Sequence, residues 1–313
     1  MNKKVSIVLP VFNEKDNIFP IYNSIVSLIK EKYNYEIIFV DDGSKDGTDI
    51  ILEKLSNIDK NVKVIIFTRN FGHQNALIAG IEKSTGDCII TMDADFQDPP
   101  ELILNLLQEW ENGYKIVYTR RTFRNDSFFK KFTANIFYSL QYFASEIKIK
   151  GEIGDFRLID RFVANQLLQL KERNKYLRGI IPWFGYDYKI INYIRPKRKF
   201  GKTKFNFIRM ARFAMTGILS FSLLPIRIGL FIGIITFFIG VSLLLHQIIT
   251  FLFNSQASDM YYFLYILNFT LIGLLFIFLW IIAEYIGKIY DEVRERPLYV
   301  IKKTINFDEN INA

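Results

Sequence analysis

The chain contains the stretch Thr91-Met-Asp-Ala-Asp-Phe-Gln-Asp-Pro-Pro-Glu101, in which two carboxylates one residue apart follow an apolar run. In an extended chain, side chains at positions i and i+2 point to the same side, so Asp93 and Asp95 are expected to project together from the end of a buried strand. Two carboxylates this close repel each other, and a divalent cation that prefers oxygen ligands removes the conflict. The pattern predicts a Mg²⁺ or Mn²⁺ site at Asp93 and Asp95, with Gln97 as a further ligand or a sugar contact.

The end of the same stretch has the pattern of a helix start. Asp98 is expected to be the N-cap, Pro99 the first helical residue and Glu101 the closing residue of a capping box. A simpler alternative for the whole stretch is that its acids only end a strand and begin a loop. The position of Asp93 and Asp95 directly after the apolar run favours binding for that pair, whereas Asp98 is expected to be structural.

Composition limits the classes of protein that the chain can represent. Its 313 residues suffice for one large or two modest domains, and 50% of them are hydrophobic and 16% aromatic, with the excess towards the C-terminus. One cysteine, Cys88, excludes an internal disulfide and fits a reducing compartment. Two histidines are too few for a histidine-based metal site. The net charge is +8, and residues 195–212 contain eight Lys or Arg and no acid. We nevertheless expect no nucleic-acid partner.

Apolar runs and amphipathic stretches alternate along the first 120 residues. The runs predict strands at residues 5–12, 35–40, 62–67, 87–92 and 115–118. The stretches between them predict helices at residues 15–32, 46–57, 74–84 and 99–112. This alternation is typical of βαβ units, so we expect an α/β fold with a mostly parallel sheet that is covered on both faces.

Polar residues follow five of the predicted strands at the point where each strand ends. They are Asn13-Glu14, Asp41-Asp42, Arg69-Asn70, Asp93 with Asp95, and Arg120-Arg121. Ligands of such sheets bind beyond the carboxyl ends of the strands, a region called the rim below. A dinucleotide site is less expected, because no G-x-G-x-x-G follows the first strand. Residues 10–14 and Asp41-Asp42 would present acceptors to a base and a ribose, with phosphates bridged by the metal.

Six motifs, in this order, carry a resemblance to a known family. They are Leu9-Pro-Val-Phe-Asn-Glu14, Val40-Asp-Asp-Gly-Ser44, Arg69-Asn-Phe-Gly72, residues 92–101, Gly154-Asp-Phe-Arg-Leu-Ile-Asp-Arg161 and Glu284-Tyr-Ile-Gly-Lys-Ile-Tyr-Asp-Glu-Val-Arg-Glu-Arg-Pro-Leu-Tyr299. The chain thereby resembles family 2 glycosyltransferases, more narrowly the polyisoprenyl-phosphate group of bactoprenol glucosyltransferases and dolichol-phosphate mannose synthases. The resemblance implies a GT-A nucleotide-sugar-binding domain, a divalent metal and an isoprenyl-phosphate acceptor. The chain departs from the usual pattern at His73, where Lys is common, and at Gly201-Lys-Thr-Lys204, where Ser is common.

The resemblance, together with the chemistry of the residues at the strand ends and in the basic loop, predicts roles for named residues. The catalytic set comprises Asp95, Asp155, Arg120 and Lys204. The nucleotide-sugar set comprises Pro10, Phe12, Asn13, Glu14, Asp42, Asn70 and Asp93. Arg124, Lys130 and Lys131 follow the fifth strand and are expected to bind the acceptor phosphate, since Arg and Lys are the usual phosphate partners. Two alternatives stay open: these cations could form a solvated face, and Asp155 could orient Arg157 or cap a loop.

The periodicity changes after residue 204. Residues 205–227 have the spacing of amphipathic helices that lie in a bilayer interface. Residues 228–258 and 260–283 contain no Asp, Glu, Lys or Arg, and such lengths predict two transmembrane helices within residues 228–283. Basic residues flank only the outer ends of this pair of helices. We therefore expect a location in the plasma membrane, which is the inner membrane in a cell that has two. The cytoplasmic side would hold the catalytic domain (residues 1–204), the tail (residues 284–313) and both termini.

Together these features predict the transfer of a single sugar from a nucleotide diphosphate sugar, with UDP-glucose as the first candidate. The acceptor would be a polyisoprenyl phosphate such as undecaprenyl phosphate, for modification of cell-surface glycans. Family resemblance suggests a homotetramer. A processive polysaccharide synthase is one alternative, but it would be expected to have more spanning helices and a Gln-x-x-Arg-Trp motif. A membrane-anchored nucleotide-sugar sensor without enzymatic activity is the other.

Overall fold

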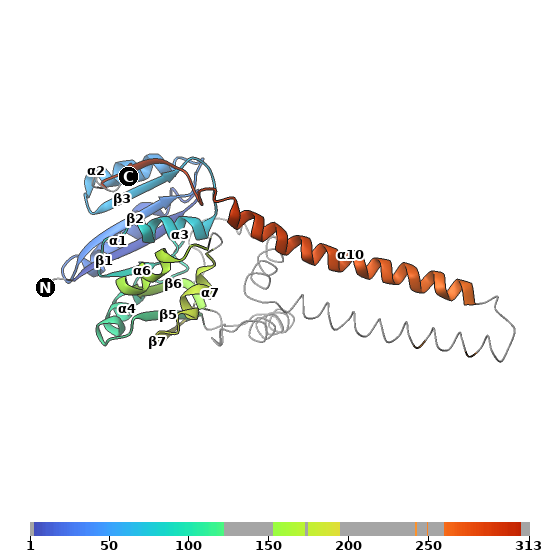
Figure 1. Cartoon of the computed structure of the whole chain (residues 1–313). Coiled ribbons are helices and arrows are strands. Elements are labelled where there is room, and N and C mark those ends of the chain that lie inside the picture. Colours follow the sequence, from blue (N-terminus) through green and yellow to red (C-terminus); the bar gives the residue numbers. More distant parts are fainter. Residues whose placement is uncertain are drawn as a thin grey trace. The chain divides into compact units, whose positions relative to one another are not determined.

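The computed structural model describes residues 3–121, 153–172, 175–194, 242, 249 and 260–307. The chain forms two compact units (Figure 1). One unit contains the described residues up to 194 together with those from Arg296 onward, and the other contains the long helix α10 (Met260–Val293). The unit with the sheet carries the rim and is described first.

The first unit is built on an eight-stranded sheet. Its strands are β1 (Lys4–Val11), β2 (Asn34–Asp41), β3 (Val62–Phe67), β4 (Cys88–Thr91), β5 (Ile116–Arg121), β6 (Ile153–Asp160), β7 (Tyr188–Tyr193) and β8 (Ile301–Ile305). Their order across the sheet is β7-β5-β6-β4-β1-β2-β3-β8. β1 pairs in parallel with β2 and with β4. β2 also pairs in parallel with β3, and β5 pairs in parallel with β7. β6 and β8 are antiparallel to their neighbours. The predicted α/β fold with a mostly parallel sheet is confirmed.

Helices cover both faces of this sheet (Figure 1). They are α1 (Ile18–Ile29), α2 (Thr48–Ile58), α3 (His73–Glu82), α4 (Leu102–Glu111), α6 (Arg161–Gln169) and α7 (Leu177–Trp183). Apolar residues of α1, α2 and α4 share one core with the sheet. α3 packs on β1 and β2 so closely that a Cβ at Gly80 would lie 2.2 Å from a methyl carbon of Val8. The helix therefore needs glycine at this position.

Strand β6 lies between β4 and β5, which the sequence pattern did not predict. Ile89 of β4 is paired with Ile159, and Val117 of β5 with Leu158, so β6 is hydrogen-bonded on both sides. Because β6 is antiparallel to both neighbours, it begins at the rim, where β4 and β5 end. Asp155 lies near its start and is thereby brought beside the carboxylates that follow β4.

Strand β8 adds the C-terminal segment to the other edge of the sheet. It pairs with β3, and Asn306, just after it, donates hydrogen bonds to the carbonyl oxygens of Ser56 at 2.7 Å and Val62 at 2.8 Å. Sequence analysis treated residues 284–313 as a tail and did not anticipate this strand. A segment that follows the predicted membrane helices is therefore part of the same sheet as β1.

A buried carboxylate joins the amino ends of the central strands, opposite the rim. Glu36 accepts hydrogen bonds from the Ser6 hydroxyl and the Thr85 backbone N–H, both at 2.6 Å, and the ammonium groups of Lys63 and Lys4 lie at 2.8 and 3.0 Å. Burial raises the pKa of Glu36, but the hydrogen bonds outweigh it and lower the pKa from 4.5 to about 2. Glu36 is thus ionised in the folded protein and connects β1, β2 and β3.

The predicted membrane region is only partly covered by the described residues. The interfacial segment (residues 205–227) lies outside them, as does nearly all of the first predicted spanning helix. The second, residues 260–283, falls within α10. Within the part of the chain that the structure describes, no helix is long and apolar enough to cross a membrane.

Candidate functional site

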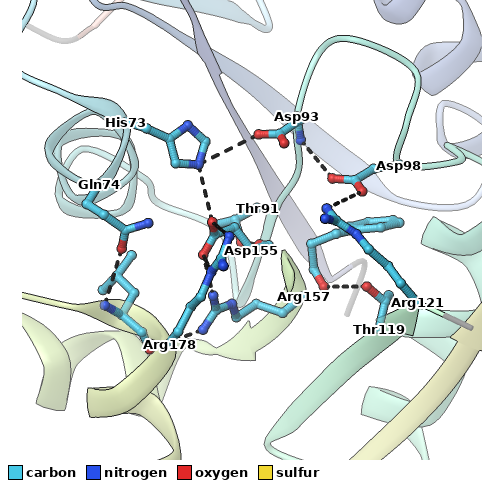
Figure 2. Close-up of polar contacts among 12 residues, drawn as sticks. His73, Gln74, Thr91, Asp93, Asp98, Thr119, Arg121, Asp155, Arg157 and Arg178 are labelled. Carbon is cyan, nitrogen blue, oxygen red and sulfur yellow. Dashed lines mark hydrogen bonds and ion pairs between the residues drawn. The ribbon is translucent and has the colours of Figure 1, made fainter. Parts of the chain in front are cut away.

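Charged side chains from four elements meet at the rim (Figure 2). Asp93 follows β4, Asp155 belongs to β6, His73 is the first residue of α3 and Arg178 lies in α7. The loop between β3 and α3 places His73 at the helix start, one residue before the predicted start at residue 74. Asp93 reaches the rim because β4 ends there, whereas Asp155, His73 and Arg178 reach it because β6, α3 and α7 begin there.

Asp155 is the centre of this group. Its Oδ1 accepts hydrogen bonds from Arg157 Nη2 at 2.7 Å and Arg178 Nε at 3.1 Å, and its Oδ2 accepts one from Arg178 Nη2 at 2.7 Å (Figure 2). Burial raises the pKa of Asp155, but Arg178, His73 and Arg157 outweigh it and hold the pKa well below its usual range. Both carboxylate oxygens are engaged by cations, so Asp155 is a weak proton acceptor.

Arg157 holds Asp155 from the buried side of this group. Only 1% of its surface is exposed, and its Nη1 donates a hydrogen bond to the carbonyl oxygen of Leu177 at 3.1 Å. Arg178 instead has 34% of its side chain exposed. The pair places one guanidinium in the core and one at the surface of the rim, with Asp155 between them. The second alternative from the sequence, that Asp155 orients Arg157, is consistent with this geometry.

His73 connects the Asp155 group to Asp93. Its Nε2 lies 3.4 Å from Asp155 Oδ2 and 3.7 Å from Asp93 Oδ1, and 41% of its side chain is exposed (Figure 2). Burial lowers the pKa of His73, but the charge of Asp93 and the hydrogen bond to Asp155 outweigh it and raise the pKa to about 9. His73 is therefore a cation at neutral pH, placed between the two carboxylates.

The loop after β4 is held by its own side chains. Asp95 Oδ1 accepts a hydrogen bond from the Gln97 backbone N–H at 3.0 Å, and Asp98 Oδ2 accepts one from the Asp93 backbone N–H at 3.2 Å. Phe96 adopts a φ of +60°, a left-handed conformation that is uncommon for a non-glycine residue. The turn keeps the three carboxylates Asp93, Asp95 and Asp98 within a very short length of chain, whereas the side chains of Ala94 and Phe96 join the hydrophobic core.

The prediction that Asp98 caps a helix is wrong. α4 begins at Leu102, its N-cap is Glu101, and no side chain makes a capping hydrogen bond. Asp98 accepts a hydrogen bond from the Tyr193 hydroxyl at 2.8 Å, and Arg121 Nη2 lies at 3.4 Å. The consecutive prolines are followed by a turn rather than by the first helical residues, so the Asp98 carboxylate connects the loop to β5 and β7 instead.

The donor atoms at the end of β4 fit a divalent cation that is partly held by substrate. Asp93 is part exposed, and Asp95 is buried within the same short loop. In the described ranges no group of three or more His, Cys, Asp or Glu side chains is arranged to hold a metal ion. Mg²⁺ is commonly held by one or two carboxylates together with phosphates of the substrate. Two carboxylates are therefore sufficient if a nucleotide diphosphate supplies further oxygens.

The loops after β1 and β2 form the other half of the rim and hold each other. The backbone N–H of Asn13 donates to Ser44 Oγ at 2.8 Å, and the Asn13 side-chain oxygen accepts from the Lys45 N–H at 2.8 Å. The backbone N–H of Glu14 donates to Thr48 Oγ1 at 3.0 Å. These bonds fix the backbone of Asn13 and Glu14 against the loop that follows Asp41-Asp42, so the two predicted nucleotide-binding segments hold each other.

Two neighbouring carboxylates at the end of β2 have different partners. Asp42 Oδ1 accepts hydrogen bonds from the backbone N–H groups of Phe71 at 2.6 Å and Gly72 at 3.2 Å, so it holds the loop before α3. Asp41 Oδ1 accepts from the backbone N–H and hydroxyl of Ser44, whereas its Oδ2 is buried without a hydrogen-bond partner among the described residues. Burial raises the pKa of Asp41. The open acceptor capacity thus belongs to Asp41, which the sequence analysis counted among the acceptors for a base and a ribose but left out of the nucleotide-sugar set.

The structure describes most of the predicted site residues. Pro10 is buried in β1, with Phe12 just after that strand, Asn70 is exposed in the loop before α3, and Arg120 lies in β5. Lys204 and the acceptor-phosphate set of Arg124, Lys130 and Lys131 lie outside the described residues. Sequence reasoning missed Arg178, because its pairing with Asp155 joins positions 23 residues apart and no local pattern marks it.

Comparisons with known proteins agree with this fold. A family model described as "Glycosyl transferase family 2" matches residues 6–168. Glucosyl-3-phosphoglycerate synthase from Mycobacterium tuberculosis, solved with Mn²⁺, UDP-glucose and phosphoglyceric acid, is similar in structure with a TM-score of 0.50. Its identity is 19%, over 70% of this chain and 79% of that one, so the likeness supports the GT-A-like fold alone.

Full-length relatives are much more similar in sequence. An "Uncharacterized glycosyltransferase YkcC" of Bacillus subtilis is 40% identical over 97% of this chain and 94% of its own length. A "SfII prophage-derived bactoprenol glucosyl transferase" of Shigella flexneri is 39% identical over 96% of this chain and 98% of its own. The likeness therefore extends beyond the sheet domain to almost the whole chain.

Proposed function

This chain belongs to glycosyl transferase family 2, and we propose that it transfers one sugar from a nucleotide diphosphate sugar, UDP-glucose first among the candidates, to a polyisoprenyl phosphate such as undecaprenyl phosphate. The observation that carries the proposal is the pairing of carboxylates with cations at the rim, where Asp93 lies 3.7 Å from the His73 imidazole and Arg178 engages Asp155. The nearly full-length likeness to bactoprenol glucosyl transferases supports the acceptor class.

The donor would bind across the carboxyl ends of β1, β2 and β4. Asp41 Oδ2, which has no hydrogen-bond partner among the described residues, is suited to accept a hydrogen bond from a base or a ribose, and the loop that Asp42 fixes forms the adjacent wall. Asp93, Asp95 and Gln97 would hold Mg²⁺ or Mn²⁺. The ion would supply Lewis acidity to the diphosphate leaving group.

The cations beside Asp155 would stabilise the negative charge that develops on the leaving diphosphate. Arg178 and His73 are both partly exposed at the rim, and both are held in place by the same carboxylate. Donors that are oriented before the reaction stabilise a developing charge without reorganising. Arg120 and Lys204 are proposed to assist in the same way.

The acceptor needs little help from a base. A phosphate monoester has a second pKa near 6, so a polyisoprenyl phosphate is largely ionised at pH 7. Asp155, with both oxygens engaged by cations and a lowered pKa, is poorly suited to remove a proton. We therefore assign Asp155 to positioning Arg178 and His73, and we assign the acceptor phosphate to Arg124, Lys130 and Lys131.

The place of action is proposed from the sequence. A lipid acceptor requires a membrane, and residues 228–258 and 260–283 lack charged side chains over lengths that suit spanning helices. Both termini and the catalytic domain would then lie on the cytoplasmic side of the plasma membrane, where nucleotide sugars are available. A tetramer is proposed by family resemblance.

One experiment tests the reaction class directly. Purified full-length protein is incubated with undecaprenyl phosphate, a divalent cation and a panel of nucleotide sugars that includes UDP-glucose and GDP-mannose. We expect a lipid product that carries one sugar, formed from one donor in the panel. Products with several sugars would indicate a processive synthase, and donor binding without any transfer would indicate a sensor.

A further inference from the structure

The loop between β3 and α3 contacts both halves of the rim. The backbone N–H groups of Phe71 and Gly72 donate to the Asp42 carboxylate, and His73 begins α3 directly after them. A Cβ at Gly43 would lie 2.5 Å from the backbone of Arg69, so this loop packs directly on the turn after β2. Residues 69–72 are therefore in direct contact with Asp42 and Gly43 and lead directly into His73.

Tyr299, close to the C-terminus, contacts the elements on both sides of this loop. Its ring stacks on Phe67, the last residue of β3, with centroids 4.9 Å apart and planes 14° apart. Its hydroxyl donates a hydrogen bond to the carboxylate of Glu82, the last residue of α3, at 2.6 Å. Phe67 in turn makes an edge-to-face contact with Phe71 at 5.7 Å. Tyr299 therefore connects the strand before the loop to the helix after it.

Strand β8 fixes Tyr299 in this position. The backbone N–H of Thr68 donates to the carbonyl oxygen of Val300 at 3.0 Å, directly beside Tyr299. The pairing of β3 with β8 shifts register between Ile66 and Phe67, at the end of β3 that leads into the loop. The ring contact of Tyr299 with Phe67 thus lies at the register shift, where β3 stops being regular.

We propose that Tyr299 is a positioning residue for the nucleotide-sugar site, which holds residues 69–72 in the conformation that supports Asp42 and His73. This inference rests on the proposed function for the identity of the ligand. It assigns a role in donor binding to a segment that follows the predicted membrane helices. Burial and the Glu82 carboxylate raise the pKa of Tyr299, so its hydroxyl stays protonated and continues to donate at physiological pH.

Three single variants of the full-length protein test this role. Tyr299→Ala removes the stacking and the hydrogen bond, whereas Tyr299→Phe removes only the hydrogen bond. Asn306→Ala is the matched control, because it loosens the same C-terminal segment at the opposite end of β3, where Asn306 contacts Val62. The control removes hydrogen bonds of the same segment and leaves the contacts of Phe67 and Glu82 in place.

The first readout needs no substrate. Hydrogen exchange of the Phe71 and Gly72 amides, which are bonded to Asp42, should be about tenfold faster in Tyr299→Ala and unchanged in Asn306→Ala. Unchanged exchange of these two amides in Tyr299→Ala would overturn the positioning role. If Tyr299→Ala does not fold, the Phe variant decides: we expect a smaller acceleration, about threefold, and no acceleration overturns the role.

The second readout connects the loop to the donor. We expect Tyr299→Ala to raise the KM for the nucleotide sugar about tenfold while the KM for polyprenyl phosphate stays within about twofold. Equal changes in both KM values, or the same change in Asn306→Ala, would mean that Tyr299 contributes only to the general stability of the protein, and would overturn the proposal. Wild-type protein that binds no nucleotide sugar would instead refute the proposed function, whereas wild-type binding with an unchanged Tyr299→Ala refutes this inference alone.

Discussion

Replacing Asp155 by asparagine keeps the shape of the side chain and removes its charge, which separates a positioning carboxylate from a catalytic base. Arg157 is 1% exposed and would lose its counter-charge, while keeping its hydrogen bond to the carbonyl oxygen of Leu177. Removing one partner of a buried ion pair costs about 3–5 kcal/mol. We take the lower end, about 3 kcal/mol, because Arg178 is 34% exposed and can be solvated by water.

The measurement is the unfolding free energy of the purified protein, followed by turnover of the folded fraction. A loss of about 3 kcal/mol corresponds to a melting temperature lower by about 6–12 °C for a domain of this size. Asp160→Asn is the control: it changes the same residue type on the same strand, but its partners are the Trp110 indole N–H at 2.8 Å and the Phe162 backbone N–H at 2.9 Å. Its expected cost is about 1 kcal/mol.

A second substitution tests the origin of the loss. If the cost comes from the orphaned guanidinium, Asp155→Asn combined with Arg157→Met should regain about 1–2 kcal/mol, because a buried apolar side chain replaces an unpaired charge. The reasoning is refuted if Asp155→Asn is as stable as the wild type and turnover nevertheless falls more than about 10³-fold. That result would identify Asp155 as a catalytic base whose ion pairs contribute little to folding.

Three further predictions concern the metal, pH and topology. Asp95→Asn should nearly abolish sugar transfer without unfolding the protein, as should chelation of the wild type, and full activity in excess EDTA would contradict the metal role. Glu36→Gln should cost about 3 kcal/mol at pH 7, since lowering a pKa from 4.5 to about 2 corresponds to that amount. This difference from the wild type should be complete above pH 4.5 and shrink as the pH falls towards 2; a cost that does not change over that interval would refute it. External labelling of intact cells should reach a cysteine introduced at Ser255, but not one at Asn2 or Asn312, and the opposite pattern would reverse the topology.

Most of the first 120 residues could be predicted because their signals are local. Each strand from β1 to β5 is a short apolar run bounded by polar residues, and each helix between them has apolar residues at helical spacing. Parallel strands joined by helices end at the same side of the sheet, so Asp93 and the Asp41-Asp42 pair could be placed at one rim without coordinates. The prediction succeeded because no long-range contact was needed to make it.

The positions of β6 and β8 depend on pairing that no local pattern specifies. β6 contains three charged residues, Asp155, Arg157 and Asp160, and nothing in its sequence indicates that it separates β4 from β5. β8 contains two consecutive lysines, Lys302 and Lys303, which weaken an apolar strand pattern. Lysine is nevertheless common on edge strands, where it discourages pairing with other chains, and β8 lies at the edge of the sheet. That signal could have identified the strand.

The same limit applies to the chemistry of the rim. From the sequence, Asp155 is one acid near a strand start, and its proton affinity cannot be read from its neighbours in the chain. The structure surrounds it with Arg157 from the same strand, Arg178 from α7 and His73 from α3. Because these three cations outnumber the one carboxylate between them, the group carries a net positive charge beside Asp93. A negatively charged diphosphate would therefore meet the carboxylates of the proposed metal site on one side and fixed cations on the other, a charge distribution suited to the departure of a nucleotide diphosphate.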